Sequence, residues 1–282
     1  MAKLRSRLRR LAGDRVASNI RSIRRQFLGL SERILFGGST RERGLVALLA
    51  SHYRSRFRRD WIHSSDPPHF WYHRAGWFRI GFEREHGGAS VYSRAFYSAE
   101  VIRTGDVVLD IGCGDGFITQ RFLAERAGHV DAIDIEPTAI RLARQLNSQS
   151  NIEYFQLDAT SQPFPSPAYD VIIWDGAIGH FDPSTTASML AKIRSSLKVD
   201  GIFAGSESLG PEGTDHLQHW ESLQDLRHVL EPTFPHTELK EQSILIGMPG
   251  SEYLRREAYW RCALEPGRLR GLRWLGDEYI RT

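Results

Sequence analysis

Acidic residues and glycines recur where short apolar runs end, a pattern that suits the binding of a nucleotide-like cofactor. The densest instance is VVLDIGCGDGFIT, residues 107–119, where Asp110 precedes the alternate glycines Gly112, Gly114 and Gly116. A strand, a glycine turn and an amphipathic helix place a ligand beyond the carboxyl end of the strand, against the helix amino terminus. Glycines let such a ligand lie close to the backbone because they carry no Cβ.

The spacing of these residues argues against a pyrophosphate as the ligand. A dinucleotide-binding turn reads GxGxxG, but here Gly116 comes one residue early and Phe117 stands where the third glycine is due. Asp110 would repel a pyrophosphate, whereas it suits a cation such as the ammonium of a methionine moiety, directly or through water. A nicotinamide-dependent reductase is therefore the weaker alternative.

This stretch resembles motif I of the class I S-adenosylmethionine-dependent methyltransferases, and the resemblance extends over about residues 105–263. It implies S-adenosylmethionine as the cofactor and a binding site at the carboxyl ends of the first four strands. The residues at the matching positions are Asp110, Gly112, Cys113, Gly114, Gly116, Asp134, Ile135, Asp158, Ala159 and Asp175.

Two of these acids have roles that the resemblance specifies. Asp134 lies 20 residues after Gly114, at the end of the second strand, where a carboxylate accepts hydrogen bonds from the ribose hydroxyls, with Ile135 along the adenosine. Asp158 and Ala159 end the third strand, where the acid binds the adenine amino group. The alternative for Asp158 is that it caps a turn or helix.

The acceptor side of the site is expected after the fourth strand, 169–175, because that strand lies beside the first and meets the transferable methyl group. His180 follows this strand and is the candidate general base, since imidazole titrates near neutrality. Alternatively, His180 is a loop residue that packs against the cofactor. Asp175 and Glu207, each at a strand end, are candidates to orient His180 or to bind the acceptor.

The acceptor class follows in part from motifs that the chain lacks. Neither an Asn-Pro-Pro-Tyr-like motif nor a Pro-Cys follows the fourth strand, which argues against methylation of nucleobases. We therefore expect a small-molecule, lipid, quinone or sugar acceptor and no nucleic acid. An RNA or protein methyltransferase anchored by a basic arm is the alternative. A noncatalytic cofactor-binding module is a third, which the intact acids oppose. No metal site is expected, because His216 and His219 have no supporting cysteine or carboxylate cluster.

The elements that must position these residues alternate along the chain as strand and helix. They predict a Rossmann-like, doubly wound α/β fold with seven strands, mostly parallel, ending in an antiparallel hairpin over 237–247 and 257–264. Helices are expected over 117–127, 184–197 and 219–230, and a strand over 202–206. We divide the chain into a basic helical extension (1–63), the methyltransferase-like domain (64–266) and a basic tail (267–282), which either meets a membrane interface or docks on the domain.

Charge is distributed unevenly along the 282 residues. Residues 1–60 carry 16 Lys and Arg against 4 Asp and Glu, or +12, which leaves −9 for the other 222 residues because the whole chain carries +3. Over residues 1–30, apolar residues recur at steps of three and four with arginines between them, which predicts a basic amphipathic helix. Such a helix suits contact with an anionic membrane surface, a targeting segment or a solvated tail. The chain has two cysteines, no apolar run of membrane-spanning length and no secretory signal, so we expect a cytoplasmic protein. Because of the basic segment, we expect it to be peripheral at the inner face of a membrane.

Overall fold

A computed structural model of the protein describes residues 88–211, 216–246 and 253–274. Within these ranges the helices are α5 (Gly88–Glu100), α6 (Pro137–Leu146), α7 (Pro183–Ser196) and α8 (Leu223–Leu230), with short turns η2 (Thr119–Leu123), η3 (Ile178–His180) and η4 (Leu269–Gly271). The strands are β1 (Val107–Ile111), β2 (His129–Asp134), β3 (Ile152–Gln156), β4 (Tyr169–Asp175), β5 (Leu197–Leu209), β6 (His236–Ile246) and β7 (Tyr253–Ala263).

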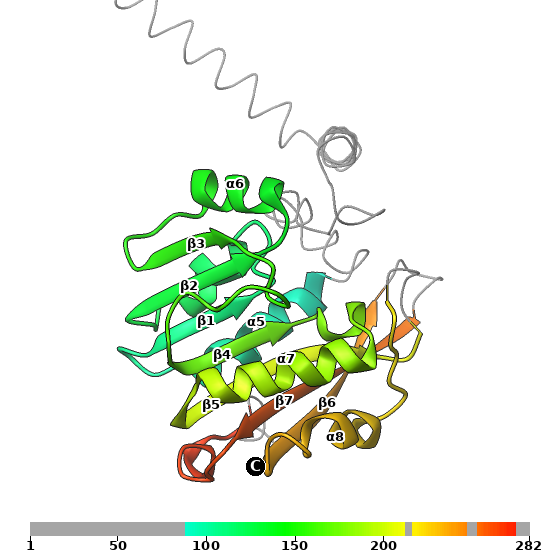
Figure 1. Cartoon of the computed structure of the whole chain (residues 1–282). Helices are drawn as coiled ribbons and strands as arrows, with labels where there is room; N and C mark the ends of the chain where they lie inside the picture. Colours follow the sequence, from blue (N-terminus) through cyan, green and yellow to red (C-terminus); the bar gives the residue numbers. More distant parts are fainter. Residues whose placement is uncertain (1–87, 212–215, 247–252, 275–282) are drawn as a thin grey trace, which may run out of the picture. The chain divides into compact units, whose positions relative to one another are not determined.

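The strands form one seven-stranded sheet in the order β3-β2-β1-β4-β5-β7-β6 (Figure 1). Strands β1 to β5 pair in parallel, whereas β7 pairs antiparallel to both β5 and β6. The carboxyl ends of β1 to β5 therefore lie at one edge, and the strand order reverses between β1 and β4. This confirms the predicted fold and places the expected ligand crevice beside the glycine turn.

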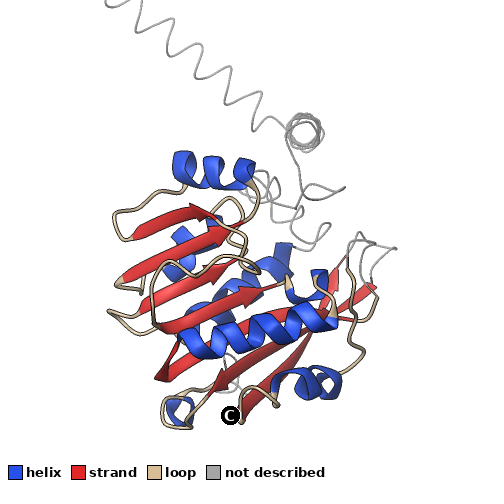
Figure 2. Ribbon diagram, in the orientation of Figure 1, coloured by secondary structure: helices blue, strands red, loops and turns tan. Residues whose placement is uncertain are grey.

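Helices cover both faces of the sheet, and each face has its own apolar core (Figure 2). One core contains Leu109, Ile172 and Phe203 from the strands and is closed by residues of α7 and α8, such as Leu190 and Leu226. The other core contains the alternate strand residues, such as Val108 and Ile173, and is closed by α5, η2 and α6. Because side chains alternate along a strand, this arrangement fixes which polar residues at the strand ends meet on the same face.

The turn after β1 requires its glycines for conformational reasons. Gly112, Gly114 and Gly116 have φ angles of 77°, 58° and 74°, a left-handed region that disfavours residues with a Cβ. A Cβ on Gly116 would also lie 2.4 Å from the hydroxyl oxygen of Tyr154 on β3. The alternate spacing is thus a property of the backbone as well as of ligand access.

Several elements differ from their predicted extents, and three of the differences bear on the site. The helix expected over 117–127 contains a π-helical turn at η2, in which the Ala124 N–H donates to the Thr119 carbonyl at 2.9 Å. Strand β5 continues to Leu209 because β7 pairs with it to its end, so Glu207 lies inside the strand. Helix α8 begins at Leu223 because Ser222 forms a capping box with Asp225.

The described part of the basic tail docks on the domain. Arg268 is 5% exposed and its guanidinium binds the Val101 carbonyl at 2.7 Å and the Asp106 carboxylate. Arg261 of β7 stacks over Trp274 with its guanidinium carbon 3.8 Å from the ring centroid. The extension predicted over 1–63 lies outside the described residues. Among the described helices, none has the length and apolar composition needed to cross a membrane.

Candidate functional site

The acid of the glycine motif, Asp110, is held inside the protein beneath the turn. It is 6% exposed, and its Oδ2 accepts a hydrogen bond of 2.6 Å from the Thr119 hydroxyl on η2. Burial raises the pKa of Asp110 to about 7, against the opposing effect of the Thr119 bond and with support from the charges of Asp175 and Asp134. Asp110 therefore has an internal partner, and its contact with a ligand ammonium stays a prediction.

Asp134 joins the end of β2 to the glycine turn. Its Oδ2 accepts from the Gly114 N–H at 2.9 Å and its Oδ1 accepts from the Glu136 N–H at 2.8 Å. The N–H groups of Gly112 and Cys113 donate to the Ile133 carbonyl, at 2.8 and 3.0 Å. A partly exposed carboxylate is thereby fixed beside three glycines that leave the backbone open, which fits the ribose-binding role predicted for it.

Neighbouring positions of the predicted cofactor site differ in exposure. Ile135 is 42% exposed although it is apolar, which suits a side chain that a flat ring would cover. Cys113 is buried, and burial raises the pKa of its thiol well above the usual range, so the thiol stays protonated at neutral pH.

Asp158 forms a turn with the residues that follow it. Its carboxylate accepts from the Thr160 N–H at 2.9 Å, the Thr160 hydroxyl at 2.7 Å and the Ser161 hydroxyl at 2.8 Å. Hydrogen bonds from Thr160 and Ser161 lower the pKa of Asp158, so it is ionised at neutral pH. The Ala159 carbonyl accepts from the Lys192 ammonium at 2.6 Å. The structure thus shows the capping role, and adenine binding stays a prediction.

Asp175 ends β4 on the face covered by α5. The Ser98 hydroxyl donates to its Oδ2 at 2.5 Å, and the Ser206 hydroxyl donates to its Oδ1 at 2.9 Å. Burial raises the pKa of Asp175 to about 6, in spite of these two bonds and the nearby positive charge of Arg94. Asp175 can therefore take up or release a proton close to neutrality.

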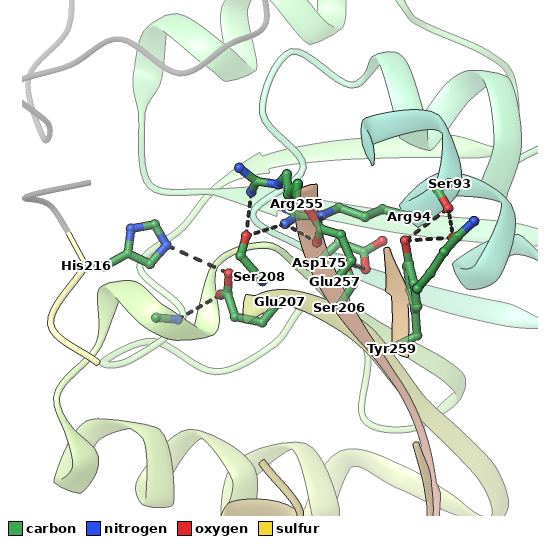
Figure 3. Close-up of polar contacts among 12 residues, drawn as sticks. Ser93, Arg94, Asp175, Ser206, Glu207, Ser208, His216, Arg255, Glu257 and Tyr259 are labelled. Atoms are coloured by element: carbon green, nitrogen blue, oxygen red, sulfur yellow. Dashed lines mark hydrogen bonds and ion pairs between the residues drawn. The ribbon is translucent and has the colours of Figure 1, made fainter. Parts of the chain in front are cut away.

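A buried ionic cluster adjoins Asp175 on the same face (Figure 3). Arg94 of α5 binds Glu257 of β7 through Nε at 3.0 Å and Nη2 at 2.6 Å, and Arg255 binds the other oxygen of Glu257 at 2.5 Å. Both arginines also contact the Ser208 hydroxyl. Glu257 is fully buried, and a Cβ on Gly176 would meet the Arg94 guanidinium at 2.0 Å. These contacts hold α5 against the carboxyl ends of β4 and β5.

Glu207 faces the opposite side of the sheet and meets histidines from two loops. It is 2% exposed and accepts from the N–H groups of Gly179 at 3.1 Å and Ser208 at 2.8 Å. The His216 Nε2 lies 3.8 Å from its Oε1 (Figure 3). Burial alone would raise the pKa of Glu207, but His216, the charge of Arg94 and the two N–H groups lower it. The ring of His180 is exposed and lies 4.3 Å from that of His216, centroid to centroid.

The predicted acceptor residues are therefore divided between two faces of one sheet edge, with Asp175 near α5 and Glu207 near His216 and His180. Sequence reasoning missed Arg94, Ser98, Ser206 and Glu257, and it considered His216 only as a metal ligand. The available signal was the alternation of Arg255, Glu257 and Tyr259 at the start of the strand predicted over 257–264, although Arg255 lies before its predicted first residue. Nothing in the sequence indicated that α5 supplies their partners.

One group among the described residues has the spacing of a metal site, and it lies at the other edge of the sheet. His129, Asp131 and Glu153 bring their ligand atoms within 4.8 Å of one another. However, Asp131 already binds His129 at 2.9 Å through one oxygen and the hydroxyls of Ser166 and Tyr169, at 2.6 and 2.8 Å, through the other. These bonds explain the cluster as part of the packing around β2.

Comparison with known proteins agrees with this geometry. Residues 108–201 match the family model described as a methyltransferase domain. An uncharacterized methyltransferase of Mycobacterium tuberculosis is 28% identical over 135 residues, which cover 47% of this chain and 67% of that protein. The malonyl-[acyl-carrier protein] O-methyltransferase of Acetivibrio thermocellus is 33% identical over 100 residues, or 35% of this chain and 34% of that protein.

A solved structure shows the same fold in a protein of low sequence identity. The DhpI–SAH complex superposes with a TM-score of 0.50 at 15% identity, and the match covers 79% of this chain and 99% of that one. At this identity the likeness concerns the fold alone.

Proposed function

Because the chain belongs to the class I S-adenosylmethionine-dependent methyltransferases, we propose that it transfers a methyl group from this cofactor to a small-molecule, lipid, quinone or sugar acceptor. The observation that carries the proposal is the junction of the glycine turn with Asp134. There a fixed carboxylate and an open backbone lie at the edge where the strand order reverses. A sulfonium cofactor suits the glycine turn because two acids, Asp110 and Asp175, lie at the carboxyl ends of the neighbouring strands β1 and β4.

In the proposed complex, Asp134 accepts hydrogen bonds from the ribose, Ile135 covers the adenosine, and Asp158 with Ala159 borders the adenine. Gly112, Gly114 and Gly116 let the cofactor lie against the backbone, beside Cys113 and above Asp110. When bound, S-adenosylmethionine supplies an electrophilic methyl group on a sulfonium. The remaining task of the chain is to align an acceptor with that methyl group and exclude water, and orientation alone can contribute about 7–11 kcal/mol.

In this proposal the acceptor binds near the carboxyl ends of β4 and β5, within reach of Asp175 on one face or of Glu207 and His180 on the other. Strand β4 separates β5 from the glycine turn, so an acceptor there would approach the methyl group from the side opposite the adenosine. The similarity to an enzyme named as an O-methyltransferase supports a small acceptor group, and does not fix the methylated atom.

The acceptor class is tested with S-adenosylmethionine carrying a tritiated methyl group. The full chain is incubated with a cell extract, which is then separated into small molecules, lipids, RNA and protein. Label in the small-molecule or lipid fraction supports the proposal, and label confined to RNA or protein contradicts it. Asp134→Ala should abolish the transfer, whereas Asp200→Ala, which changes an exposed acid remote from the turn, serves as the matched control.

We further propose that residues 1–30 bring the enzyme to the inner face of an anionic membrane, as a peripheral cytoplasmic protein. The support is the +12 charge of residues 1–60 and the leucine spacing within 1–30. Full-length protein should sediment with vesicles containing phosphatidylglycerol and not with neutral vesicles. Protein lacking residues 1–30 should stay in solution, and its retention on the vesicles would assign membrane contact to another segment.

A further inference from the structure

The strongest unassigned feature is the buried carboxylate of Glu207. A carboxylate that is 2% exposed is stabilised only where it is paired, because burial of an unpaired charge is unfavourable. Two backbone N–H groups, from Gly179 and Ser208, bind its two oxygens. A further neighbour is the His216 imidazole, whose Nε2 lies 3.8 Å from Oε1, and the charge of Arg94 also acts on this carboxylate. The carboxylate therefore has a fixed orientation relative to one histidine ring.

The His216 ring is fixed as well, through the segment that carries it. The N–H groups of Leu217 and Gln218 both donate to the Gly179 carbonyl, at 2.8 and 3.1 Å. The Gln218 amide donates to the Phe181 carbonyl at 2.8 Å and to the Thr186 hydroxyl at 2.9 Å. The ring lies so close to Gly179 that a Cβ there would be 2.3 Å from its Cδ2. Gly179 thus binds Glu207 through its N–H and anchors the His216 segment through its carbonyl.

This geometry separates the roles of His216 and His180. The His216 side chain is 12% exposed and faces the carboxylate, whereas His180 is exposed and its ring centroid lies 4.3 Å from that of His216. A neutral imidazole carries its single proton on the nitrogen that faces a carboxylate. Because Nε2 of His216 faces the Glu207 carboxylate at 3.8 Å, we expect it to hold the proton, which leaves the lone pair on Nδ1, a buried atom.

We propose that His216, oriented by Glu207, is the general base of the reaction and that the acceptor is an alcohol or a phenol. This inference rests on the proposed function. As the acceptor oxygen attacks, the O–CH₃ bond forms, the S–CH₃ bond breaks and the sulfonium becomes a neutral thioether. The acceptor proton moves to Nδ1 of His216. The resulting imidazolium keeps the positive charge within the site, beside the Glu207 carboxylate. An ionised acceptor such as a carboxylate would need no base.

The orientation is tested without any acceptor, by nitrogen-15 NMR of the histidine-labelled full chain, with His216 assigned through His216→Gln. Its ring should show the Nε2–H tautomer. Glu207→Gln should remove that preference and lower the pH at which the ring gains its second proton. The exposed His228 should titrate identically in both proteins. An Nδ1–H tautomer in the wild type, or no change in Glu207→Gln, overturns the proposal.

The chemistry is tested with S-adenosylmethionine and a panel of phenols, alcohols and the corresponding amines. We expect methylation of oxygen, and His216→Gln should lower kcat by about 10²–10⁴-fold with little change in KM. Glu207→Gln should shift the acidic limb of the pH profile, a change that a merely structural residue would not cause. Transfer to nitrogen alone, or loss of that limb in His180→Ala but not in His216→Gln, overturns the proposal.

The two levels of proposal can fail separately. Failure to bind S-adenosylmethionine in calorimetry would contradict the proposed function itself. Binding of the cofactor with no methylation of any hydroxyl in the panel would contradict only the assignment of His216 and its acceptor class.

Discussion

Replacing Gly116 by alanine tests the claim that the glycine turn is specified by its backbone and by its contact with β3. At a φ of 74°, an alanine is disfavoured by about 1–2 kcal/mol. Its Cβ would also lie 2.4 Å from the Tyr154 hydroxyl oxygen and 2.7 Å from two ring carbons, so the ring must move. Tyr154 is 5% exposed and donates a 2.8 Å hydrogen bond to the Asn147 carbonyl, which that movement would break.

Three effects add to the expected loss in the free energy of unfolding of Gly116→Ala. The backbone contributes about 1–2 kcal/mol, overpacking about 1–3 kcal/mol and the lost hydrogen bond about 1 kcal/mol, which gives about 3–6 kcal/mol for Gly116→Ala. Gly105→Ala is the matched control, because Gly105 also has a positive φ, 92°, but a Cβ there would meet nothing within 4 Å. The free energy of unfolding of Gly105→Ala should therefore fall only by the backbone contribution of about 1–2 kcal/mol.

Urea denaturation of the full-length variants measures both losses as free energies of unfolding. Gly116→Ala should be the less stable of the two by at least about 2 kcal/mol, since only it displaces Tyr154. Equal losses in the two variants would refute the reasoning, because the contact with Tyr154 would then contribute nothing. Combining Gly116→Ala with Tyr154→Leu should restore part of the difference, as expected for residues in contact.

Two further predictions concern buried charge. The pKa of Asp110 is raised to about 7 from an ordinary 3.8, so its contribution to stability is present below about pH 4 and is lost as pH rises through 7. Asp110→Asn should therefore flatten the free energy of unfolding between pH 4 and 7, and an unchanged slope would show that Asp110 is not the titrating group. Arg94→Met should cost about 3 kcal/mol because it removes one of two partners of the buried Glu257, whereas Arg256→Met, which breaks a more exposed pair with Glu241, should cost less than about 1 kcal/mol. Equal costs in urea denaturation would contradict this difference.

Much of the fold could be predicted from the sequence because its signals are local. Apolar runs, capping residues and the alternate glycines 112, 114 and 116 act within a few residues, and the strand order then follows from the resemblance to a known family. The predicted ends of strands were less accurate where pairing with a strand far away in the sequence determines them. Strand β5 extends past Ser206 because β7, some fifty residues later, continues to pair with it.

The candidate site was predictable only in part, for the same reason. Asp134 and the glycine turn are joined over 20 residues, a spacing that a motif can encode. Arg94 and Glu257 are 163 residues apart, and no local pattern links a helix before the first strand to the last strand of the sheet. The pairing of Glu207 with His216 was likewise hidden, because it depends on how the loop after β5 returns to Gly179.

The central claim is that the junction of the glycine turn and Asp134 binds S-adenosylmethionine. Isothermal titration calorimetry of the full chain tests it most directly, with S-adenosylmethionine, its demethylated product and NADH as separate ligands. We predict binding of the first two in the micromolar range, no binding of NADH, and loss of binding in Asp134→Ala with the fold retained. Binding of NADH alone, or unchanged affinity in Asp134→Ala, would contradict it.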